Sequence, residues 1–342
     1  MKKEKLTIND IAQMAGVSTA TVSRVLSGKD KVKEETKQHV LDIVKKSGYD
    51  SSKLTALSND ESKTILVCMT ELKNPFNVPV FDGIQNSARK HGYDVLILQT
   101  KDFYTEYHEY ESVLKSQSFA GVIFVSTLTQ KQLTDITTKL NYRTPIVLCS
   151  EYIDDPEISY VGIDDISAIT RATNYLLSLN RKNIFFINSK LTHNYARKRE
   201  QGFREALESA NVEVNEDYIV RMSSVNHSLA YASTLSILNQ DDKPDAILCA
   251  SDVFAIGALK ACQRKGLRVP EDIAIIGFDN IELTTMVEPS LTTIEQPSYK
   301  IGYQSCELLV EKIVNPRALD KHILLETELI LRDSTPINIK GE

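Results

Sequence analysis

The chain has 342 residues, of which 42% are hydrophobic and 25% are charged, and its formal net charge is −6. This length exceeds what a single compact core usually holds, so we expect more than one domain. The composition is ordinary for a globular protein, and no apolar run approaches the roughly 18 residues of a membrane span. The first residues also lack the apolar segment of a signal peptide. We therefore expect a cytoplasmic protein without a membrane partner.

The charge is distributed unevenly along the chain. Residues 1–60 contain 11 Lys and Arg and 8 Asp and Glu, a net of +3, so the remaining residues carry −9. A basic front on an acidic body is typical of a protein whose N-terminal region meets a polyanion such as nucleic acid.

The cysteine pattern indicates neither a metal site nor a disulfide framework. The number of cysteines is odd, and no pair has the C-x-x-C spacing of a zinc site. Cys68, Cys149 and Cys249 each lie within an apolar run, where a buried thiol is expected. The remaining two are Cys262 and Cys306.

The front of the chain predicts two short helices joined by a tight turn. Thr7 and Asp10 have the spacing of a capping box, and Gly16 ends the first helix. Its apolar face consists of Ile8, Ile11, Ala12 and Ala15. Ser18 can cap a second helix over residues 19–26. This arrangement is typical of a helix-turn-helix.

The second helix has an inner and an outer face. The inner face consists of Val22, Val25 and Leu26, and the outer face of Thr19, Ala20, Ser23 and Arg24. Short side chains let a backbone approach DNA closely, and Arg24 can pair with guanine or phosphate. The same spacing also fits a helical hairpin that only packs, so the residues alone leave both interpretations open.

A third helix is expected over residues 34–47, followed by a linker. Its buried stripe is predicted at Val40, Leu41, Ile43 and Val44. Glu34 and Glu35 in its first turn and Lys45 and Lys46 in its last complement the helix dipole. Residues 49–63 are polar and read as a domain boundary, although Leu54 and Leu57 interrupt them.

From Thr64 onward, short apolar runs alternate with amphipathic stretches. This alternation predicts βα units around parallel sheets that helices cover on both faces. The runs are "TILVCM", "YDVLIL", "AGVIFVS", "TPIVLCS", "NIFFIN", "DAILCAS" and "IAIIGFD". They fit either one large sheet or two smaller ones.

Ligands of such folds bind at the carboxyl ends of the strands. The polar and aromatic residues just after the runs are Asn74, Phe76, Asn77, Ser126, Ser150, Glu151, Tyr152, Ser251, Asp252, Asp279 and Asn280, and Arg199 lies in a basic stretch that begins another helix. Such a set suits a small polyhydroxylated ligand. Each residue also has an ordinary alternative role as a helix cap or turn residue.

Signals for an enzyme are weak. The sequence has no G-x-G-x-x-G after a strand, no P-loop, no G-x-S-x-G and no His pair at metal-ligand spacing. His91, His193 and His227 are scattered and expected at the surface. We therefore expect no catalytic residue, metal or cofactor.

Several motifs together resemble the lactose repressor/galactose repressor family of bacterial transcription regulators. "TINDIAQMAGVSTATVSRVLSG" is similar to its N-terminal signature, and "RVPEDIAIIGFDNIELTTMVEPSLTTIEQP" to its C-terminal one. "NPF", "RKREQGFREAL" and "SDVFAIGALKA" match landmarks between them in the expected order. The resemblance covers nearly the whole chain and favours DNA binding over simple packing.

The resemblance implies a three-helix headpiece (1–50), a hinge (51–63) and a periplasmic-binding-protein-like α/β core (64–336). The core would consist of two Rossmann-like subdomains, the first formed by 64–161 and 293–322 and the second by 162–292 and 323–336. It also implies a homodimer on operator DNA with two-fold symmetry. A small effector between the subdomains would control operator affinity.

Family positions map onto individual residues here. For DNA these are Ser18, Thr19, Ala20, Thr21, Ser23, Arg24, Lys31 and, as the hinge leucine that enters the minor groove, Leu57 with Leu54 as second choice. For the effector, Phe76, Asn77, Arg199 and Asp279 match family positions, and Ser126, Ser150, Tyr152 and Ser251 follow strands.

Three departures from the family pattern stand out. Lys33 replaces a Ser or Thr cap of the third helix, which weakens the headpiece by about 1 kcal/mol. Ser251 replaces an Asn and offers fewer hydrogen bonds to an effector. The hinge "YDSSKLTALS" lacks the family's proline, and its leucine is shifted by one position.

The expected effector is a sugar or sugar phosphate. Residues 150–165 and 275–302 are particularly similar to the cytidine-responsive member of the family, which makes a nucleoside the alternative. A phosphoprotein corepressor on the first subdomain is a further alternative. A sugar-binding receptor would need a signal peptide, and a sugar-modifying enzyme would need a base or nucleophile at a strand end.

Overall fold

The computed structural model describes residues 7–26, 32–47, 62–99, 113, 119–125, 128–139, 144–153 and 157–336. By its internal contacts the chain divides into two units, Met1–Ser62 and Lys63–Glu342. Among the described residues, no helix is both long and apolar enough to cross a membrane. Residues 51–61 of the predicted hinge, which include Leu54 and Leu57, lie outside the described residues, as do Lys31 and Ser126.

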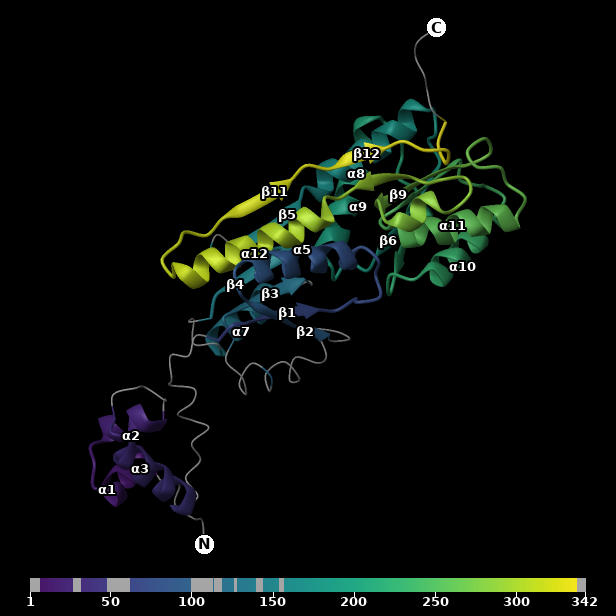
Figure 1. The fold of residues 1–342 in the computed structure, drawn as a ribbon. Helices are drawn as coiled ribbons and strands as arrows, with labels where there is room; N and C mark the ends of the chain where they lie inside the picture. Colours follow the sequence, from purple (N-terminus) through teal and green to yellow (C-terminus); the bar gives the residue numbers. More distant parts are fainter. Residues whose placement is uncertain are drawn as a thin grey trace. The chain divides into compact units, whose positions relative to one another are not determined.

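The first unit contains the three predicted helices α1 (Ile8–Ala15), α2 (Thr19–Leu26) and α3 (Glu34–Ser47), shown in Figure 1. The capping box is confirmed, since Asp10 N–H donates to Thr7 Oγ1 and Thr7 N–H donates to Asp10 Oδ2. Gly16 ends α1 with φ +63°, a conformation that glycine adopts without steric cost.

A small apolar core holds these helices together. It consists of Ile11, Ala12, Ala15, Val22, Val25, Val40 and Val44. The prediction that Leu41 is buried is wrong, because 36% of this residue is exposed. Val40 and Val44 share one face of α3 at i,i+4 spacing, and Leu41 follows Val40 by about 100° around the helix.

The second unit contains two six-stranded sheets, one in each of two lobes. The first sheet has the order β11-β5-β4-β3-β1-β2 and is parallel throughout. Its strands are β1 (Thr64–Met69), β2 (Asp94–Gln99), β3 (Gly121–Val125), β4 (Ile146–Ser150), β5 (Ser159–Ile163) and β11 (His322–Leu325). All seven predicted apolar runs form strands, and they are divided between two sheets.

The second sheet has the order β12-β10-β9-β8-β6-β7, and only β12 is antiparallel to its neighbour. Its strands are β6 (Ile184–Ser189), β7 (Ile219–Met222), β8 (Ala246–Cys249), β9 (Ala274–Asp279), β10 (Thr292–Glu295) and β12 (Glu328–Ile330). The central strands β8 and β9 are buried along their whole length, as expected for a parallel sheet covered on both faces.

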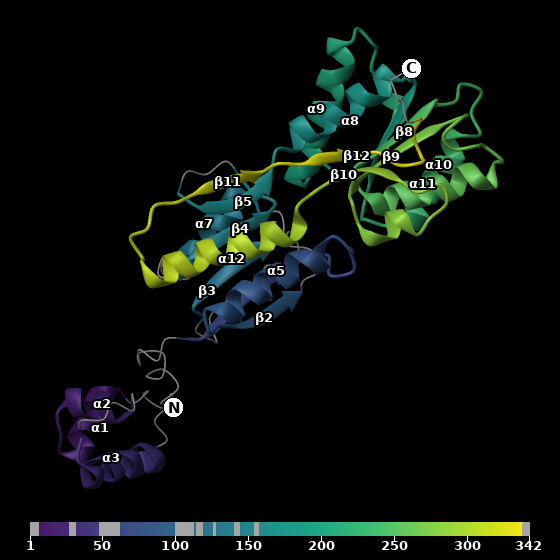
Figure 2. The same cartoon turned by 45° about the horizontal axis from the view of Figure 1, so that its top comes forward.

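Helices cover both sheets on both faces. Those of the first lobe are α5 (Asn77–Lys90), α7 (Gln130–Lys139) and α12 (Ser298–Val314), and those of the second lobe are α8 (Asp165–Ser178), α9 (Asn194–Ser209), α10 (His227–Ile237) and α11 (Asp252–Arg264). Helices α5 and α12 lie side by side on one face of the first sheet (Figure 2). Short 3₁₀ helices span Glu216–Tyr218 and Glu282–Thr285.

The pair α5 and α12 crosses at two glycines. A Cβ on Gly83 would lie 2.2 Å from the Tyr299 carbonyl oxygen, and one on Gly302 would lie 1.9 Å from the Val80 carbonyl oxygen. No side chain fits at either position, so the two backbones are in direct contact. This contact joins a helix from the start of the core to one near its end.

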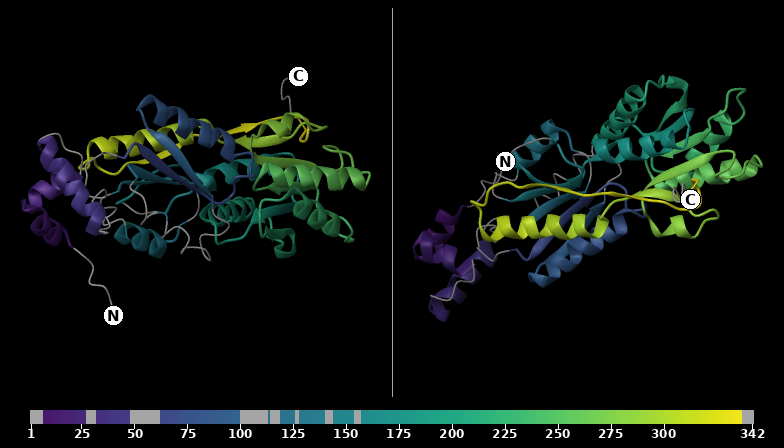
Figure 3. Two further views of the ribbon diagram at one scale, coloured as in Figure 1. Left: turned by 60° about the horizontal axis from the view of Figure 1, so that its bottom comes forward. Right: turned by 90° about the horizontal axis from the view of Figure 1, so that it is seen from above.

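The chain passes between the lobes three times, and each passage lies later than predicted. The predicted boundaries after residues 161, 292 and 322 all fall inside strands. Strand β5 belongs wholly to the first sheet, β10 to the second and β11 to the first, because each is paired along its length. The passages therefore follow Ile163, Glu295 and Leu325, and the last is part of the yellow segment that joins the lobes in Figure 3.

All five cysteines are buried and free, which confirms the expectation for Cys68, Cys149 and Cys249. Burial raises the pKa of the Cys149 thiol to about 12. Burial also raises the pKa of the Cys68 thiol, by a larger amount. Such thiols stay protonated at neutral pH and serve as small apolar core groups.

Candidate functional site

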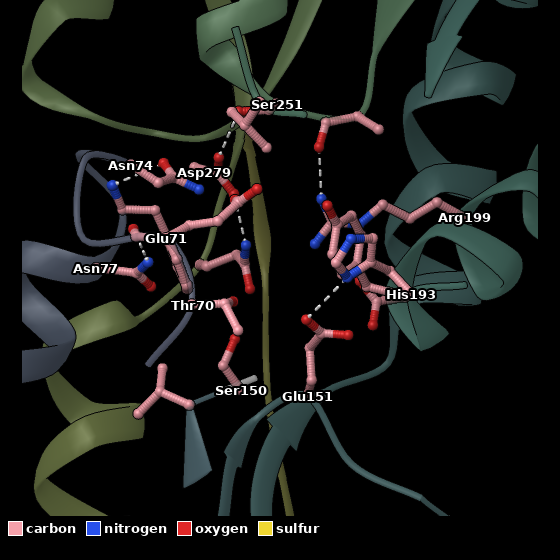
Figure 4. Close-up of a pocket in the computed structure, with 17 residues that line it drawn as sticks. Thr70, Glu71, Asn74, Asn77, Ser150, Glu151, His193, Arg199, Ser251 and Asp279 are labelled. Carbon is pink, nitrogen blue, oxygen red and sulfur yellow. Dashed lines mark hydrogen bonds and ion pairs between the residues drawn. The ribbon is translucent and has the colours of Figure 1, made fainter. Parts of the chain in front are cut away.

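A pocket lies where the carboxyl ends of the two sheets face each other (Figure 4). Strand β1 delivers Glu71, β4 delivers Ser150, β8 delivers Ser251 and β9 delivers Asp279 to this pocket. Its lining is Thr70, Glu71, Asn74, Phe76, Asn77, Val125, Ser150, Glu151, Asp165, His193, Tyr195, Arg199, Val225, Ala250, Ser251, Asp279 and Gln296. Because both lobes contribute, a bound molecule would bridge them.

Arg199, in the second turn of α9, is the central cation of the pocket. Its Nε donates to Asp165 Oδ1 over 2.8 Å, and its Nη1 donates to the Ala250 carbonyl over 2.6 Å. The guanidinium carbon lies 3.6 Å from the centre of the Phe278 ring. Only 5% of Arg199 is exposed, so these contacts fix the guanidinium in place beside the pocket.

Asp279 ends β9 in a strained backbone conformation, with φ +115°. Its Oδ2 accepts a hydrogen bond from Ser251 Oγ over 3.0 Å, and its Oδ1 accepts one from Gln296 Nε2 over 2.7 Å. Burial raises the pKa of this carboxyl to about 6, although the charge of Arg199 opposes the shift. The carboxylate is therefore held in one orientation toward the pocket.

Asp252 is buried beneath Asp279 and does not line the pocket. Its Oδ1 accepts from Thr293 Oγ1 over 2.7 Å, and its Oδ2 accepts from the Ile281 N–H over 2.9 Å. Burial raises the pKa of Asp252 well above its usual value, and the nearby Asp279 raises it further. This residue therefore supports the loop after β9 from below.

Contacts between the lobes surround the pocket. His193 Nδ1 lies 3.6 Å from Glu151 Oε1, and Asn194 Nδ2 donates to the Tyr152 carbonyl. Burial disfavours the His193 imidazolium, but the hydrogen bond that His193 donates to Glu151 and the charges of Glu151 and Glu71 outweigh this effect and raise its pKa. Burial raises the pKa of the Glu71 carboxyl in the first lobe, although the charge of His193 and the Val225 N–H, both of the second lobe, oppose the shift.

The arrangement suits reversible binding of a small polar molecule. Carboxylates, amides and hydroxyls offer several hydrogen bonds, while Phe76 and Tyr195 supply aromatic surface. Within the described ranges, no group of three or more His, Cys, Asp or Glu side chains could hold a metal ion.

A second candidate surface is the outer face of α2 in the first unit. Thr19, Ala20 and Arg24 are exposed there, as predicted. Ser18 Oγ accepts the Thr21 N–H over 3.1 Å and lies 2.8 Å from Thr21 Oγ1, so Ser18 caps the helix. The exposed side chains are short apart from Arg24, and a backbone can approach a DNA groove closely over such a surface.

Comparison with known proteins assigns the chain to a family. Residues 7–52 match bacterial regulatory proteins of the lacI family, and residues 173–335 match the periplasmic binding protein-like domain. HTH-type transcriptional repressor CytR of Escherichia coli (strain K12) is 33% identical over 330 residues, which is 96% of each chain. The chain belongs to the LacI family. It is thus a helix-turn-helix regulator of transcription with an effector-binding domain.

Further LacI-family proteins are similar over the whole length or the core. HTH-type transcriptional repressor PurR of Mannheimia succiniciproducens is 30% identical over 96% of this chain and 98% of its own. The solved complex of transcriptional regulator CelR with cellobiose has a TM-score of 0.74 at 26% identity and covers 96% of this chain and 99% of that chain. These matches confirm the expected headpiece and periplasmic-binding-protein-like core.

Six of the eight predicted effector residues line the pocket of this LacI-family chain. They are Phe76, Asn77, Ser150, Arg199, Ser251 and Asp279, and their role in effector binding stays a prediction. Tyr152 does not line it. Ser150 has φ +69° and turns the chain, so Tyr152 stacks on Tyr160 at a centroid distance of 4.2 Å and donates its hydroxyl to the Ile163 carbonyl.

Sequence reasoning missed several pocket residues. His193 was expected at the surface, but it lines the pocket and is only partly exposed. The sequence patterns do not indicate Glu71, Asp165, Tyr195 or Gln296 either, although all four line the pocket. Glu71 follows a predicted strand, so its position in the sequence is a signal that could have identified it as a pocket residue. Asp165 and Tyr195 lie in the first turns of helices, His193 precedes α9 and Gln296 follows the short strand β10, and their place in the pocket depends on how the lobes pack.

The pH dependence of stability should reveal Asp279. Its folded pKa of about 6 exceeds the usual 3.8, so between these values the folded chain binds more protons than the unfolded chain. The free energy of unfolding should therefore fall as the pH rises through this window. We expect the free energy of unfolding of the parent minus that of Asp279→Asn, both measured by urea denaturation, to fall from pH 4 to pH 6. An equal difference at both pH values would contradict the burial of this carboxyl.

Proposed function

We propose that the chain represses transcription by binding operator DNA as a homodimer in the cytoplasm, with an affinity that an effector in the pocket between the lobes controls. Residues 1–50 would form the headpiece, 51–63 the hinge and 64–336 the core. The observation that carries this proposal is a pocket whose polar walls come from both lobes. A ligand that bridges two lobes favours one relative orientation of them, and so shifts the balance between two states of the protein.

The DNA side of the proposal is supported by the outer face of α2. Thr19 and Ala20 would contact base edges, and Arg24 would pair with guanine or phosphate. Thr21 and Ser23 would lie beside these residues, and Ser18 and Lys31 would contact the DNA backbone or flanking positions. Leu57 would enter the minor groove between the two half-sites. A homodimer would present two copies of α2 to a pseudo-palindromic operator.

The proposed effector is a sugar, sugar phosphate or nucleoside. The complex of the similar regulator CelR with cellobiose supports a sugar. The resemblance of residues 150–165 and 275–302 to the cytidine-responsive member supports a nucleoside. Alternatively, a phosphoprotein corepressor could bind the first lobe. Because the pocket holds its carboxylates and Arg199 in fixed hydrogen bonds and ion pairs without a catalytic set among the described residues, we propose binding without turnover.

A titration of operator DNA tests both halves of the proposal. Operator fragments selected from random DNA by the protein itself should bind with an affinity that falls steeply between 50 and 200 mM salt, about 10³-fold for roughly six neutralised phosphates. Addition of the correct effector should change this affinity by at least about fivefold. A flat salt response would contradict DNA binding through the headpiece. Consumption of the effector would instead indicate an enzyme.

A further inference from the structure

Negative charge predominates in the pocket. Four carboxyl side chains line it, whereas only two lining side chains are basic. The acidic residues are Glu71, Glu151, Asp165 and Asp279, and the basic residues are His193 and Arg199. This excess sets which ligands the pocket can accept, because like charges at close range repel strongly where water is excluded.

Both basic side chains are already paired with carboxylates. Arg199 Nε lies 2.8 Å from Asp165 Oδ1, and Arg199 Nη1 donates to the Ala250 carbonyl. His193 lies 3.6 Å from Glu151. A bound phosphate usually needs bidentate or clustered cationic donors directed at its oxygens. A phosphate here would compete with existing buried pairs rather than complete an unfilled cationic site.

Two lysines near the pocket do not supply the missing charge. Lys198 Nζ lies 3.9 Å from the centre of the Tyr152 ring, and Tyr152 is itself outside the lining. Lys190 adds positive charge toward Glu71 and His193, but it is not a lining residue either.

Glu71 is placed to act on a ligand directly. It lies in the loop between β1 and α5, on the side of the pocket opposite Arg199 and His193 (Figure 4). Its backbone is fixed, because Asn77 Nδ2 donates to the Glu71 carbonyl over 2.7 Å. The Val225 N–H of the other lobe also acts on its carboxyl and lowers its pKa, against the larger effect of burial. A ligand between the lobes would therefore meet a half-buried, oriented acceptor.

We infer that this pocket selects an effector that carries no phosphate, and that Glu71 is the residue that rejects anions. The ligand is a neutral or cationic polyhydroxylated compound whose O–H or N–H groups donate to Glu71 and Asp279. This inference rests on the proposed function, since it assumes that the effector binds in this pocket. Among the effectors considered, it keeps sugars and nucleosides and removes sugar phosphates.

Matched pairs of compounds test this inference by isothermal titration calorimetry on the full-length protein. The pairs are glucose and glucose 6-phosphate, ribose and ribose 5-phosphate, cytidine and cytidine monophosphate, and adenosine and adenosine monophosphate. In at least one pair, the unphosphorylated member should bind at least about tenfold more tightly. Glu71→Gln should reduce that ratio by at least about threefold, whereas Glu208→Gln, which removes the same charge from an exposed position on α9, should leave it unchanged.

The possible results distinguish the charge preference of the pocket from its assignment as the effector site. If the phosphorylated member binds as well or better, the charge argument is overturned while the pocket remains the effector site. If the ratio responds equally to Glu71→Gln and Glu208→Gln, the role assigned to Glu71 is overturned. If no member of any pair binds at millimolar concentration, and no pair changes operator affinity, both this inference and the proposed effector are wrong.

Discussion

Replacing Arg199 with methionine should lower the free energy of unfolding of the core by about 3–5 kcal/mol. The reason is the fate of Asp165, whose side chain is only 4% exposed and whose carboxylate accepts from Arg199 Nε. Methionine fills similar volume but leaves Asp165 as a buried charge without its cation. Urea denaturation followed by circular dichroism at 222 nm measures the loss, and calorimetry should show no binding of an effector that the parent binds.

Two further variants isolate the cause. Arg199→Met with Asp165→Asn removes both charges and should regain a large part of the lost stability without restoring effector binding. Arg268→Met breaks an ion pair whose arginine side chain is 71% exposed, and it should cost less than about 1 kcal/mol. A loss of the same size for Arg199→Met and Arg268→Met would contradict a buried ion pair beside the pocket.

The variant Ala20→Glu should lower operator affinity by about 100-fold or more, which corresponds to about 2.7 kcal/mol. Ala20 is exposed on α2, and glutamate is a good helix former, so the fold should be unaffected. Its carboxylate would face the phosphates and bases that α2 is expected to contact. Fluorescence anisotropy with a labelled operator at constant salt gives the dissociation constant.

His39→Glu is the matched control for this experiment. His39 is exposed on α3, so the substitution adds the same negative charge to the headpiece away from the proposed DNA surface. Its effect on operator affinity should stay within about threefold. Equal losses from both variants would indicate a general charge effect and would overturn the assignment of α2 as the reading helix.

Sequence patterns identify the central strands of the parallel sheets, which are buried on both faces. Runs such as Ile275–Phe278 must be apolar because helices cover both faces of the strand, so their composition marks them. Edge and short strands carry weaker signals. The strand His322–Leu325 alternates exposed and half-buried residues, and Thr292–Glu295 is largely hydroxyl and charged. Such segments become strands because a neighbouring strand offers them hydrogen bonds. Their own composition does not predict this pairing.

The same reasoning explains which pocket residues the sequence could indicate. Ser150, Ser251 and Asp279 follow long apolar runs, and their position at the carboxyl end of a strand is a local property. Tyr152 shows the limit of this rule, because the left-handed backbone at Ser150 sends its ring into the core. His193 and Asp165 reach the pocket only because helices α9 and α8 begin there, which is a property of how two lobes pack together.

The connection between the lobes also has a consequence for biosynthesis. The first lobe depends on α12 and β11, which are made after nearly the whole second lobe. Until then, the face of the first sheet beneath α12 stays uncovered, and α5 lacks the partner against which Gly83 packs. From the same late segment the second lobe needs the edge strand β12 and the residues after it, of which Ser334 accepts the Ile275 N–H. A growing chain therefore holds most of the second lobe before the first lobe receives α12 and β11, so the lobe whose synthesis begins first gains its covering helix only after most of the other lobe has been made.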